Sequence, residues 1–172
     1  ISKPIVGDFF SGSFISNVDI NRPKDASSLL DGKMRYFSNQ LFNVGSPPNW
    51  FIDPESNGIF PKDRHWSSID DFSNGDIKLV WELGRFTWVL DLVRAWLISG
   101  DDAHTDVMFR LVDDFIYNNP LYVGPHWTSE QEVAIRALML IYILEVLSDH
   151  QSLTEHRLLT IHTLLEFHAI YL

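Results

Sequence analysis

The sequence predicts an all-α fold of antiparallel helical hairpins behind a loop-rich N-terminal arm. Three observations support this prediction. The second half of the chain reads as successive helices joined by short connections, which make neighbouring helices antiparallel. No segment shows the strict apolar–polar alternation that is typical of a half-buried strand. Glycine and proline instead punctuate the first part of the chain at short intervals.

Length and composition bound the class of protein. The chain has 172 residues, which favours one domain, and 45% of them are hydrophobic, which is enough for a sizeable core. Its formal net charge of −10 argues against nucleic acid as a partner, because non-specific nucleic-acid binders need a basic surface. Any anionic ligand would have to bind at a local cationic patch. The chain has no cysteine, so disulfides and cysteine-based metal sites are excluded.

The two ends of the chain and its apolar runs bear on processing. The first residue is not methionine, and no signal peptide is visible. Residues 169–172 continue an apolar helical pattern without a capping glycine or a polar tail, so we expect a fragment of a longer protein. The longest apolar run, 138–144, is far too short to span a bilayer, so no membrane span is expected.

Residues 1–45 form the predicted N-terminal arm, in which no helical period is visible. Residues 25–30 could form a short helix that Gly32 closes, and residues 33–37 could form an extended piece. We expect a loosely structured arm that packs on something else, with residues 46–172 forming the rest of the chain.

Residues 46–75 are predicted to be a long, aromatic-rich loop. A loop of this length in a compact domain is usually either functional or an error in the assignment of elements, and its aromatic rings are costly to leave in water. Trp50 and Trp66 therefore either pin the loop to the core or provide a platform on which a sugar stacks.

The strongest helical pattern covers residues 76–99. Asn74 or Asp76 can cap its start. Apolar residues cover most of its circumference, so we expect it to be buried on several sides. Glu82 and Arg85 lie three positions apart and are expected to pair, either as a structural bridge or as part of a site.

Three further helices are predicted. An amphipathic helix follows Gly100 and covers residues 101–118, where an Asn-Asn-Pro sequence stops it. A third helix covers residues 129–147. A fourth runs to the end of the chain from Thr154, which can serve as its N-cap.

The segment 124–137, Gly-Pro-His-Trp-Thr-Ser-Glu-Gln-Glu-Val-Ala-Ile-Arg-Ala, leads from a loop into the third helix. Its Gly-Pro pair cannot continue a helix. Thr128 and Ser129 are good N-cap residues, and each has a capping-box partner three positions later. His126 and Trp127 thus lie before a helix N-terminus, whose free N–H groups and dipole suit a carboxylate ligand.

Motifs of several other classes are absent from the sequence, which has no phosphate-binding glycine loop, nucleophile elbow or His-Glu-x-x-His. His162 and Glu166 have a spacing that could ligate a metal, but two such residues are more often a surface or packing pair. His156, His162 and His168 recur every six residues and so do not share one helical face. We therefore assign no metal and no cofactor.

Three segments carry a family resemblance. The first is 47–54, with Trp66 and Ile69 behind it; the second is 75–86, Gly-Asp-Ile-Lys-Leu-Val-Trp-Glu-Leu-Gly-Arg-Phe. The third is 124–137, which is similar to the pattern Gly-Val-Asn-Trp-x-Ser-x-x-Glu-Val-Ala-x-Arg-Ala. In this order and spacing, the segments resemble the N-terminal domain of the heparinase II/III family of polysaccharide lyases.

The resemblance implies that residues 46–172 are the N-terminal part of an incomplete (α/α) toroid, with helical hairpins around a cleft that holds a polysaccharide. The implied reaction is β-elimination, in which the C5 proton of a uronic acid is removed and the 4-linked sugar leaves. The site must neutralise the carboxylate and supply a base and an acid, because negative charge builds on a group that is already negative. The expected partner is an anionic uronate polysaccharide resembling heparan sulfate or alginate, and the expected location is periplasmic or secreted in a bacterium.

His126 stands where many members of the family carry Asn and some carry His. By resemblance, it binds or neutralises the uronate carboxylate, or acts as the catalytic base; from the residues alone, it is either a loop anchor or a catalytic residue. As a neutral imidazole it would donate a hydrogen bond. The residues expected to bind substrate are Trp127, Glu130, Arg136, Trp50 and Asn49.

Several features favour other interpretations. Glu130 and Glu132 can simply favour the helix N-terminus, and Arg136 can pair with Glu132. The family's catalytic tyrosine lies beyond the last residue in an Asn-His-rich segment, and Tyr171 lacks that context. The second catalytic histidine and the C-terminal β-sandwich are missing too, so this chain alone is expected to be inactive.

Two other functions remain open. One is a non-catalytic helical domain that binds a glycan or another protein. The other is a toroid glycosidase, which would use two carboxylates; it is the weakest reading, because Glu130 and Glu132 lie on different sides of a helix. The apolar helix faces of an open toroid would also favour a homodimer.

Overall fold

The computed structural model describes residues 23–37 and 40–172. Two antiparallel helical hairpins form its upper layers, α4 (Trp88–Ser99) with α5 (Ala103–Asn118) and α6 (Glu130–Val146) with α7 (Glu155–Tyr171). The last three of the predicted helices are therefore confirmed, with small differences at their ends. Gly100 ends α4 in the left-handed conformation, and the Thr154 hydroxyl caps α7 by accepting from the Arg157 N–H at 3.3 Å.

The prediction of one continuous helix over residues 76–99 is wrong, because the chain breaks after α3 (Ile77–Gly84). Asp76 caps α3 as expected, but Phe86 has a φ of 63°. This left-handed conformation costs a non-glycine residue about 1–2 kcal/mol. In exchange, the fully buried Phe86 ring packs at 4.9 Å from Phe115 and 5.0 Å from Trp88. Burying a ring of this size is worth about 1.5–3 kcal/mol, so the packing offsets the strain.

The described part of the N-terminal region contains α2 (Pro23–Leu30) and a hairpin of β1 (Lys33–Tyr36) and β2 (Gln40–Asn43). The short helix before Gly32 and the extended piece after it are confirmed. The strands pair antiparallel, with Lys33 opposite Asn43 and Tyr36 opposite Gln40. The all-α prediction holds for the helical layers and is wrong for this hairpin.

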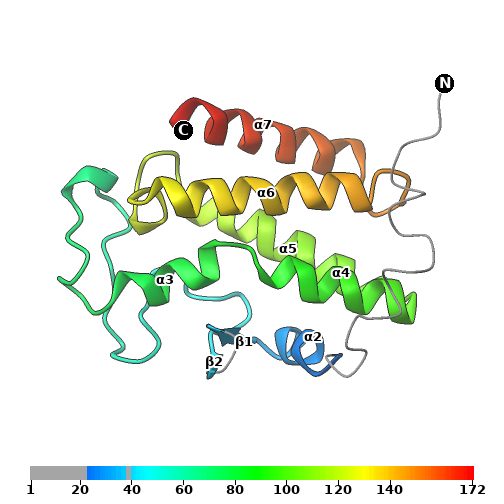
Figure 1. The fold of residues 1–172 in the computed structure, drawn as a ribbon, viewed down its shortest axis with the longest axis horizontal. Coiled ribbons are helices and arrows are strands. Elements are labelled where there is room, and N and C mark those ends of the chain that lie inside the picture. The colour runs from blue at the N-terminus through cyan, green and yellow to red at the C-terminus, as the bar shows by residue number, and fades with distance from the viewer. Residues whose placement is uncertain (1–22, 38–39) are drawn as a thin grey trace.

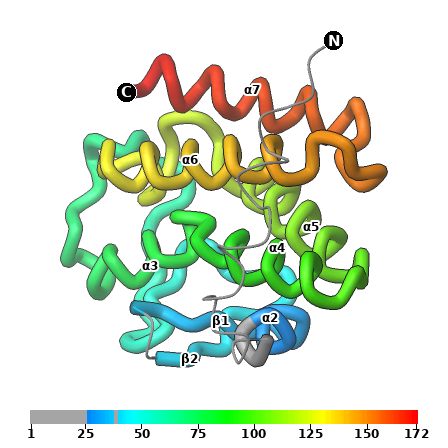
Figure 2. The backbone as a smooth tube through the Cα atoms, turned by 45° about the vertical axis from the view of Figure 1, so that its right-hand side comes forward, coloured from blue at the N-terminus to red at the C-terminus, as the bar shows by residue number. Residues whose placement is uncertain are grey.

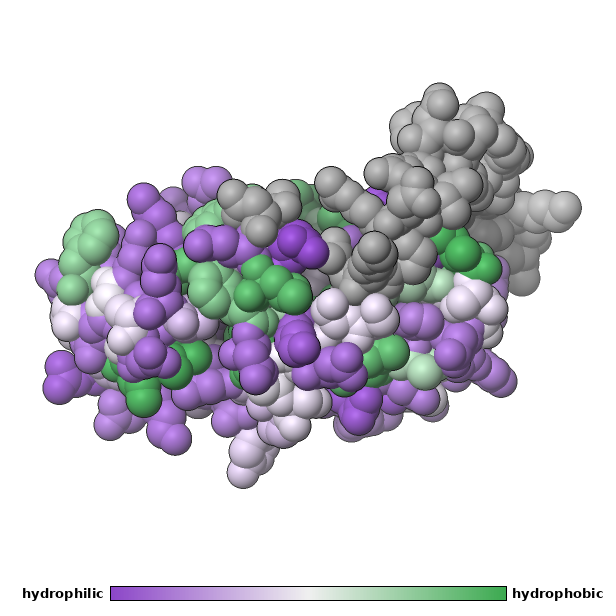
Figure 3. Space-filling model, turned by 90° about the horizontal axis from the view of Figure 1, so that it is seen from below, coloured by the Kyte–Doolittle hydropathy of each residue, from purple (hydrophilic) through white to green (hydrophobic). Residues whose placement is uncertain are grey.

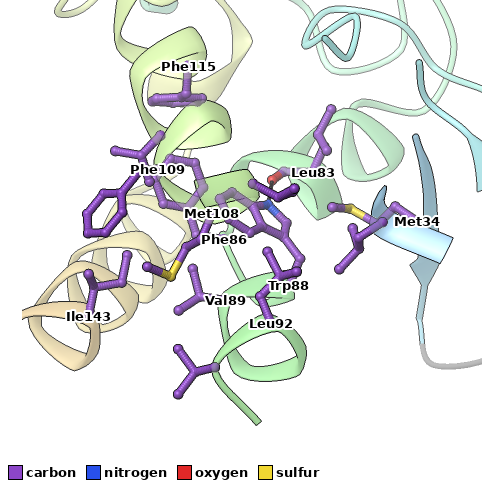
Figure 4. Packing of buried hydrophobic residues seen from close by; sticks show 14 of the residues in the cluster. Met34, Leu83, Phe86, Trp88, Val89, Leu92, Met108, Phe109, Phe115 and Ile143 are labelled. Atoms are coloured by element: carbon purple, nitrogen blue, oxygen red, sulfur yellow. Dashed lines mark hydrogen bonds between the residues drawn. The ribbon is translucent and has the colours of Figure 1, made fainter. Parts of the chain in front are cut away.

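The elements stack in layers around one main core. Figures 1 and 2 both show α7 on α6, then α3, α4 and α5, and then α2 with the hairpin. Figure 4 shows that the packing runs from Met34 of β1 through Phe86, Trp88 and Met108 to Ile143 of α6. Ala26, Leu29, Met34, Tyr36 and Val44 thus share this core, whereas residues 1–22 of the predicted arm lie outside the described residues. Both the predicted domain boundary and the toroid remain predictions.

The predicted long loop, 46–75, carries only a short helical turn, η2 (Trp66–Ser68), and isolated bridges. In Figure 3, the described surface of one face is mostly hydrophilic, and its apolar residues form separate patches.

Among the described residues, no helix is both long enough and apolar enough to cross a bilayer.

Candidate functional site

The segment expected to carry the chemistry contains a single 3-10 turn, η3 (Pro125–Trp127), here called the motif turn. Gly124 enters it with a φ of 89°. The turn lies at the end of the molecule where α3 and α6 begin and α7 ends (Figure 1). Neither predicted capping box forms: Ser129 makes no side-chain cap bond, and the Thr128 hydroxyl donates instead to the Pro125 carbonyl at 2.9 Å.

Three helices hold the motif turn through its carbonyl groups. The indole N–H of Trp81 in α3 donates to the first carbonyl at 3.0 Å. The Nη2 of Arg136 in α6 donates to the second, that of His126, at 3.0 Å. The hydroxyl of Tyr171 in α7 donates to the third. The turn is therefore fixed from three sides.

His126 lies fully buried beneath this turn. Its Nε2 is 2.8 Å from the Trp50 carbonyl, so Nε2 carries the proton and Nδ1 is bare. Nδ1 has no hydrogen-bond partner among the described residues and faces Gly84. Burial and then the charge of Arg136 lower the pKa of His126 to about 3, which keeps the imidazole neutral. In this arrangement His126 anchors the loop, and a catalytic role, which stays a prediction, requires the ring to become accessible.

Arg136 is also fully buried, and its bonds go to neutral groups. Nη1 donates to the Gly84 carbonyl at 3.1 Å, and Nε donates to Nε2 of His168 at 2.8 Å. The guanidinium lies 4.9 Å from the Phe115 ring centroid and 5.2 Å from that of Trp127. Burial lowers the pKa of Arg136 to about 9, although nearby carboxylate charge opposes the shift. Arg136 therefore reaches no solvent in this arrangement, and its substrate-binding role stays a prediction.

A separate ion-pair cluster joins α3 to α6. Arg85 contacts carboxylate oxygens of both Glu82 and Glu132, with Nη2 at 2.8 Å from Oε1 of Glu132. The predicted Glu82–Arg85 pair is confirmed. The predicted pair between Arg136 and Glu132 is wrong, because Arg85 occupies the carboxylate of Glu132.

The other predicted site residues separate into buried and exposed ones. Trp50 and Trp127 are each only 1% exposed, and the Trp50 indole donates to Asp114 at 2.6 Å, so Trp50 pins the loop to the core. Glu130 is exposed on the first turn of α6, at the edge of the same corner. Asn49 is exposed too, and its side-chain Oδ1 accepts from the nearby Phe51 N–H at 3.1 Å. The structure thus gathers the buried His126, Trp127, Arg136 and Trp50, whereas Glu130 and Asn49 are exposed.

Half-exposed aromatic rings form the surface over the motif turn. Trp66 lies 6.0 Å from Tyr171, and Tyr122 lies 5.8 Å from Tyr171, between ring centroids. The backbone N–H of Trp66 donates to the Tyr122 carbonyl at 3.0 Å, which holds the loop that carries Trp66 next to Tyr122. Lys62 and Arg64 are exposed on that loop.

Sequence reasoning missed Tyr122, and it set aside Tyr171 and His168. Of Tyr122, Tyr171 and His168, only Tyr171 had a usable signal in the sequence, which is its position at the end of a predicted helix. Tyr122 adopts a φ of 63°, a conformation that sequence does not indicate for tyrosine.

No group of three His, Cys, Asp or Glu side chains in the described part of the chain could hold a metal ion.

Comparison with solved structures shows that the chain has the fold of a polysaccharide lyase. It superposes on the crystal structure of heparan sulfate lyase HepC from Pedobacter heparinus with a TM-score of 0.71 and 16% identity. A mutant of the same enzyme gives a TM-score of 0.70, also with 16% identity. Each match covers 93% of this chain and 23% of the other, so the chain spans about a quarter of the length of these enzymes.

This similarity confirms the resemblance to heparinase-type lyases at the level of the fold. At this identity the likeness does not extend to activity or substrate. No family model matches the sequence, and no curated protein matches it.

Proposed function

We propose that this chain is part of a polysaccharide lyase that cleaves a uronic-acid-containing polysaccharide, of the heparan sulfate or alginate kind, by β-elimination. One observation carries the proposal beyond the fold. The three sequence segments that resemble the lyase family are far apart in the chain, yet each contributes a neighbour to one point. The His126 ring of the third segment contacts the Trp50 carbonyl of the first and Gly84 of the second.

The surface over this point has the chemistry that a uronate chain needs. Half-exposed rings such as Trp66 and Tyr171 suit the apolar faces of sugar rings. Lys62 and Arg64, which flank the exposed Asp63, place cationic side chains on this loop in a chain whose net charge is −10. A polysaccharide bound there would lie directly over the motif turn.

His126 contributes to this reaction as a neutral group. While the ring is buried, its pKa of about 3 keeps the imidazole uncharged near neutral pH. Because the Trp50 carbonyl already uses the Nε2 proton, the atom left for chemistry is the bare Nδ1. Nδ1 faces Gly84 in the interior, so substrate binding must first make this atom accessible before it can accept a proton.

The test is turnover by the full-length product of the gene that encodes this chain. Heparan sulfate and alginate are offered, and the ultraviolet absorbance of an unsaturated uronate is followed. We expect His126→Ala to lower kcat about a hundredfold or more, the usual contribution of a general acid or base. His162→Ala, at an exposed histidine of α7, is the matched control and should keep the wild-type rate. The proposal fails if neither polysaccharide yields the absorbance.

The second candidate is a non-catalytic glycan- or protein-binding domain, favoured by the complete burial of His126 and by apolar side chains on the outer helices. Leu138 and Ile141 of α6 are 60% and 52% exposed, and Leu159 and Ile170 of α7 are 65% and 73% exposed. This candidate predicts binding of heparan sulfate without an unsaturated product.

A homodimer through these faces stays a prediction, which light scattering would test. The periplasmic or secreted location is also a proposal, which cell fractionation would test.

A further inference from the structure

We infer that Arg136 and His168 form a positioning pair that fixes the motif turn, and with it His126, without touching the substrate. The inference rests on the proposed lyase function of this corner and adds two residues to its machinery. It also gives Arg136 a role other than direct contact with the uronate carboxylate.

Arg136 ties three elements together through one rigid group. Its Nη1 holds the Gly84 carbonyl at the end of α3, and its Nη2 holds the His126 carbonyl in the motif turn. Its Nε holds His168 of α7 at 2.8 Å. A guanidinium presents these donors in one plane, so the positions of the three acceptors are set relative to one another.

His168 is built to accept from a cation. Its Nδ1 is 2.7 Å from the Leu164 carbonyl, so the ring proton lies on Nδ1 and the lone pair of Nε2 faces Arg136. The ring is fully buried and packs in a tilted arrangement against Trp127, with 5.2 Å between centroids. His168 therefore orients the guanidinium from α7, next to Trp127 of the motif turn.

The pair acts on His126 through the backbone. Holding the His126 carbonyl fixes the peptide from which the ring projects towards Gly84 and the Trp50 carbonyl. Neither Arg136 nor His168 has exposed surface, so neither side chain contacts a substrate bound at the surface in this arrangement. Their effect on the reaction is therefore through the position of His126. A displacement of a reacting group by about 1 Å can cost about a hundredfold in rate.

The experiment compares Arg136→Lys, which keeps the charge but not the planar fork, with His168→Leu and His168→Gln in the full-length gene product. Deuterium exchange over residues 124–129 and the NMR signal of the His126 Nε2 proton are measured first, since neither requires activity. We expect Arg136→Lys and His168→Leu to accelerate exchange about tenfold or more and to broaden the signal. His168→Gln, which can still accept from Arg136, should restore most of the protection.

Steady-state kinetics then distinguish positioning from contact. Arg136→Lys should lower kcat with KM nearly unchanged, whereas loss of a contact to the uronate would raise KM. Arg94→Lys, in a half-exposed pair with Asp91 on α4, is the matched control and should change neither value. The inference is overturned if His168→Leu leaves exchange and the His126 signal as in the wild type, or if it perturbs them and His168→Gln perturbs them equally. Absence of turnover in every variant, with the exchange results as expected, would refute the proposed function and leave the positioning geometry standing.

Discussion

Replacing Gly84 by alanine tests the packing beneath the motif turn most sharply. A Cβ at this position would lie 2.6 Å from Cε1 and 3.1 Å from Cγ of His126, and closer still to Nδ1. The His126 ring can move only at a cost, because it is fully buried and lies 5.3 Å from Phe115, between centroids. Gly84 has an ordinary helical backbone, so the strain comes from this contact alone.

The cost follows from three contributions. Overpacking a filled interior costs about 1–3 kcal/mol. Pushing the ring off the Trp50 carbonyl, now at 2.8 Å from Nε2, loses a further 0.5–1.5 kcal/mol or so. Alanine gains up to about 1 kcal/mol over glycine in a helix. We therefore expect Gly84→Ala to lower the free energy of unfolding by about 1–3 kcal/mol, which is a fall in Tm of roughly 3–10 °C for a chain of this size.

The assay is urea and thermal unfolding of Gly84→Ala, His126→Ala and the double variant. Because His126→Ala removes the ring that a Cβ would strike, Gly84→Ala should cost nothing in that background, giving a coupling energy about equal to its cost alone. Gly100→Ala is the control for a cost that does not involve His126: a Cβ there would meet nothing within 4 Å, but the φ of 67° strains alanine by about 1–2 kcal/mol, and this cost should persist in the His126→Ala background. The reasoning is refuted if Gly84→Ala is as stable as the wild type, or if its cost persists without His126.

Three further predictions follow. Burial lowers the pKa of both His126 and His168 from 6.5 to about 3, so between these pH values only the unfolded state gains their protons. The free energy of unfolding should therefore fall by up to about 3 kcal/mol for each pH unit below 6.5. His168→Gln should halve this slope in urea titrations, and an unchanged slope would show that His168 is not a buried neutral imidazole. Burial raises the pKa of Asp53, but hydrogen bonds from Ser56 and backbone N–H groups outweigh it and leave the pKa lowered. The stability that Asp53 contributes is therefore present above pH 4 and lost as pH falls through its folded pKa, so Asp53→Asn should cost about 1–2 kcal/mol at pH 7 and nothing in strong acid, as thermal scans at both pH values would reveal. Trp50→Phe should lose about 1–3 kcal/mol with its 2.6 Å bond to a carboxylate, and wild-type stability would show that the loop is not pinned there.

Local signals were sufficient to predict most of the helical architecture. Proline and asparagine end α5, Thr154 caps α7, and Gly100 closes α4, so these boundaries depend on neighbours in the sequence. The break after Gly84 depends instead on contacts with His126 and Phe115, which lie on other elements. The period of the apolar residues continues through the break and therefore conceals it.

The candidate site was predictable in its location but not in its burial. The motif around His126 marks the right corner, because its residue order is local information. That the loop of Trp50 covers the ring, and that Arg136 faces His168 rather than Glu132, are outcomes of packing between distant segments. Spacing on a helix identifies which face a residue shares, and not what the neighbouring helix places opposite it.

The mass of the cleaved ends tests the proposed lyase function most directly. Heparan sulfate or alginate is incubated with the full-length gene product, and the new oligosaccharide ends are weighed by mass spectrometry. Elimination predicts fragments that together have the mass of the original chain, with an unsaturated uronate at each new non-reducing end. Fragments heavier by one water molecule per cleavage would identify a hydrolase, and bound but uncleaved polysaccharide would identify a binding domain; either result would contradict the proposal.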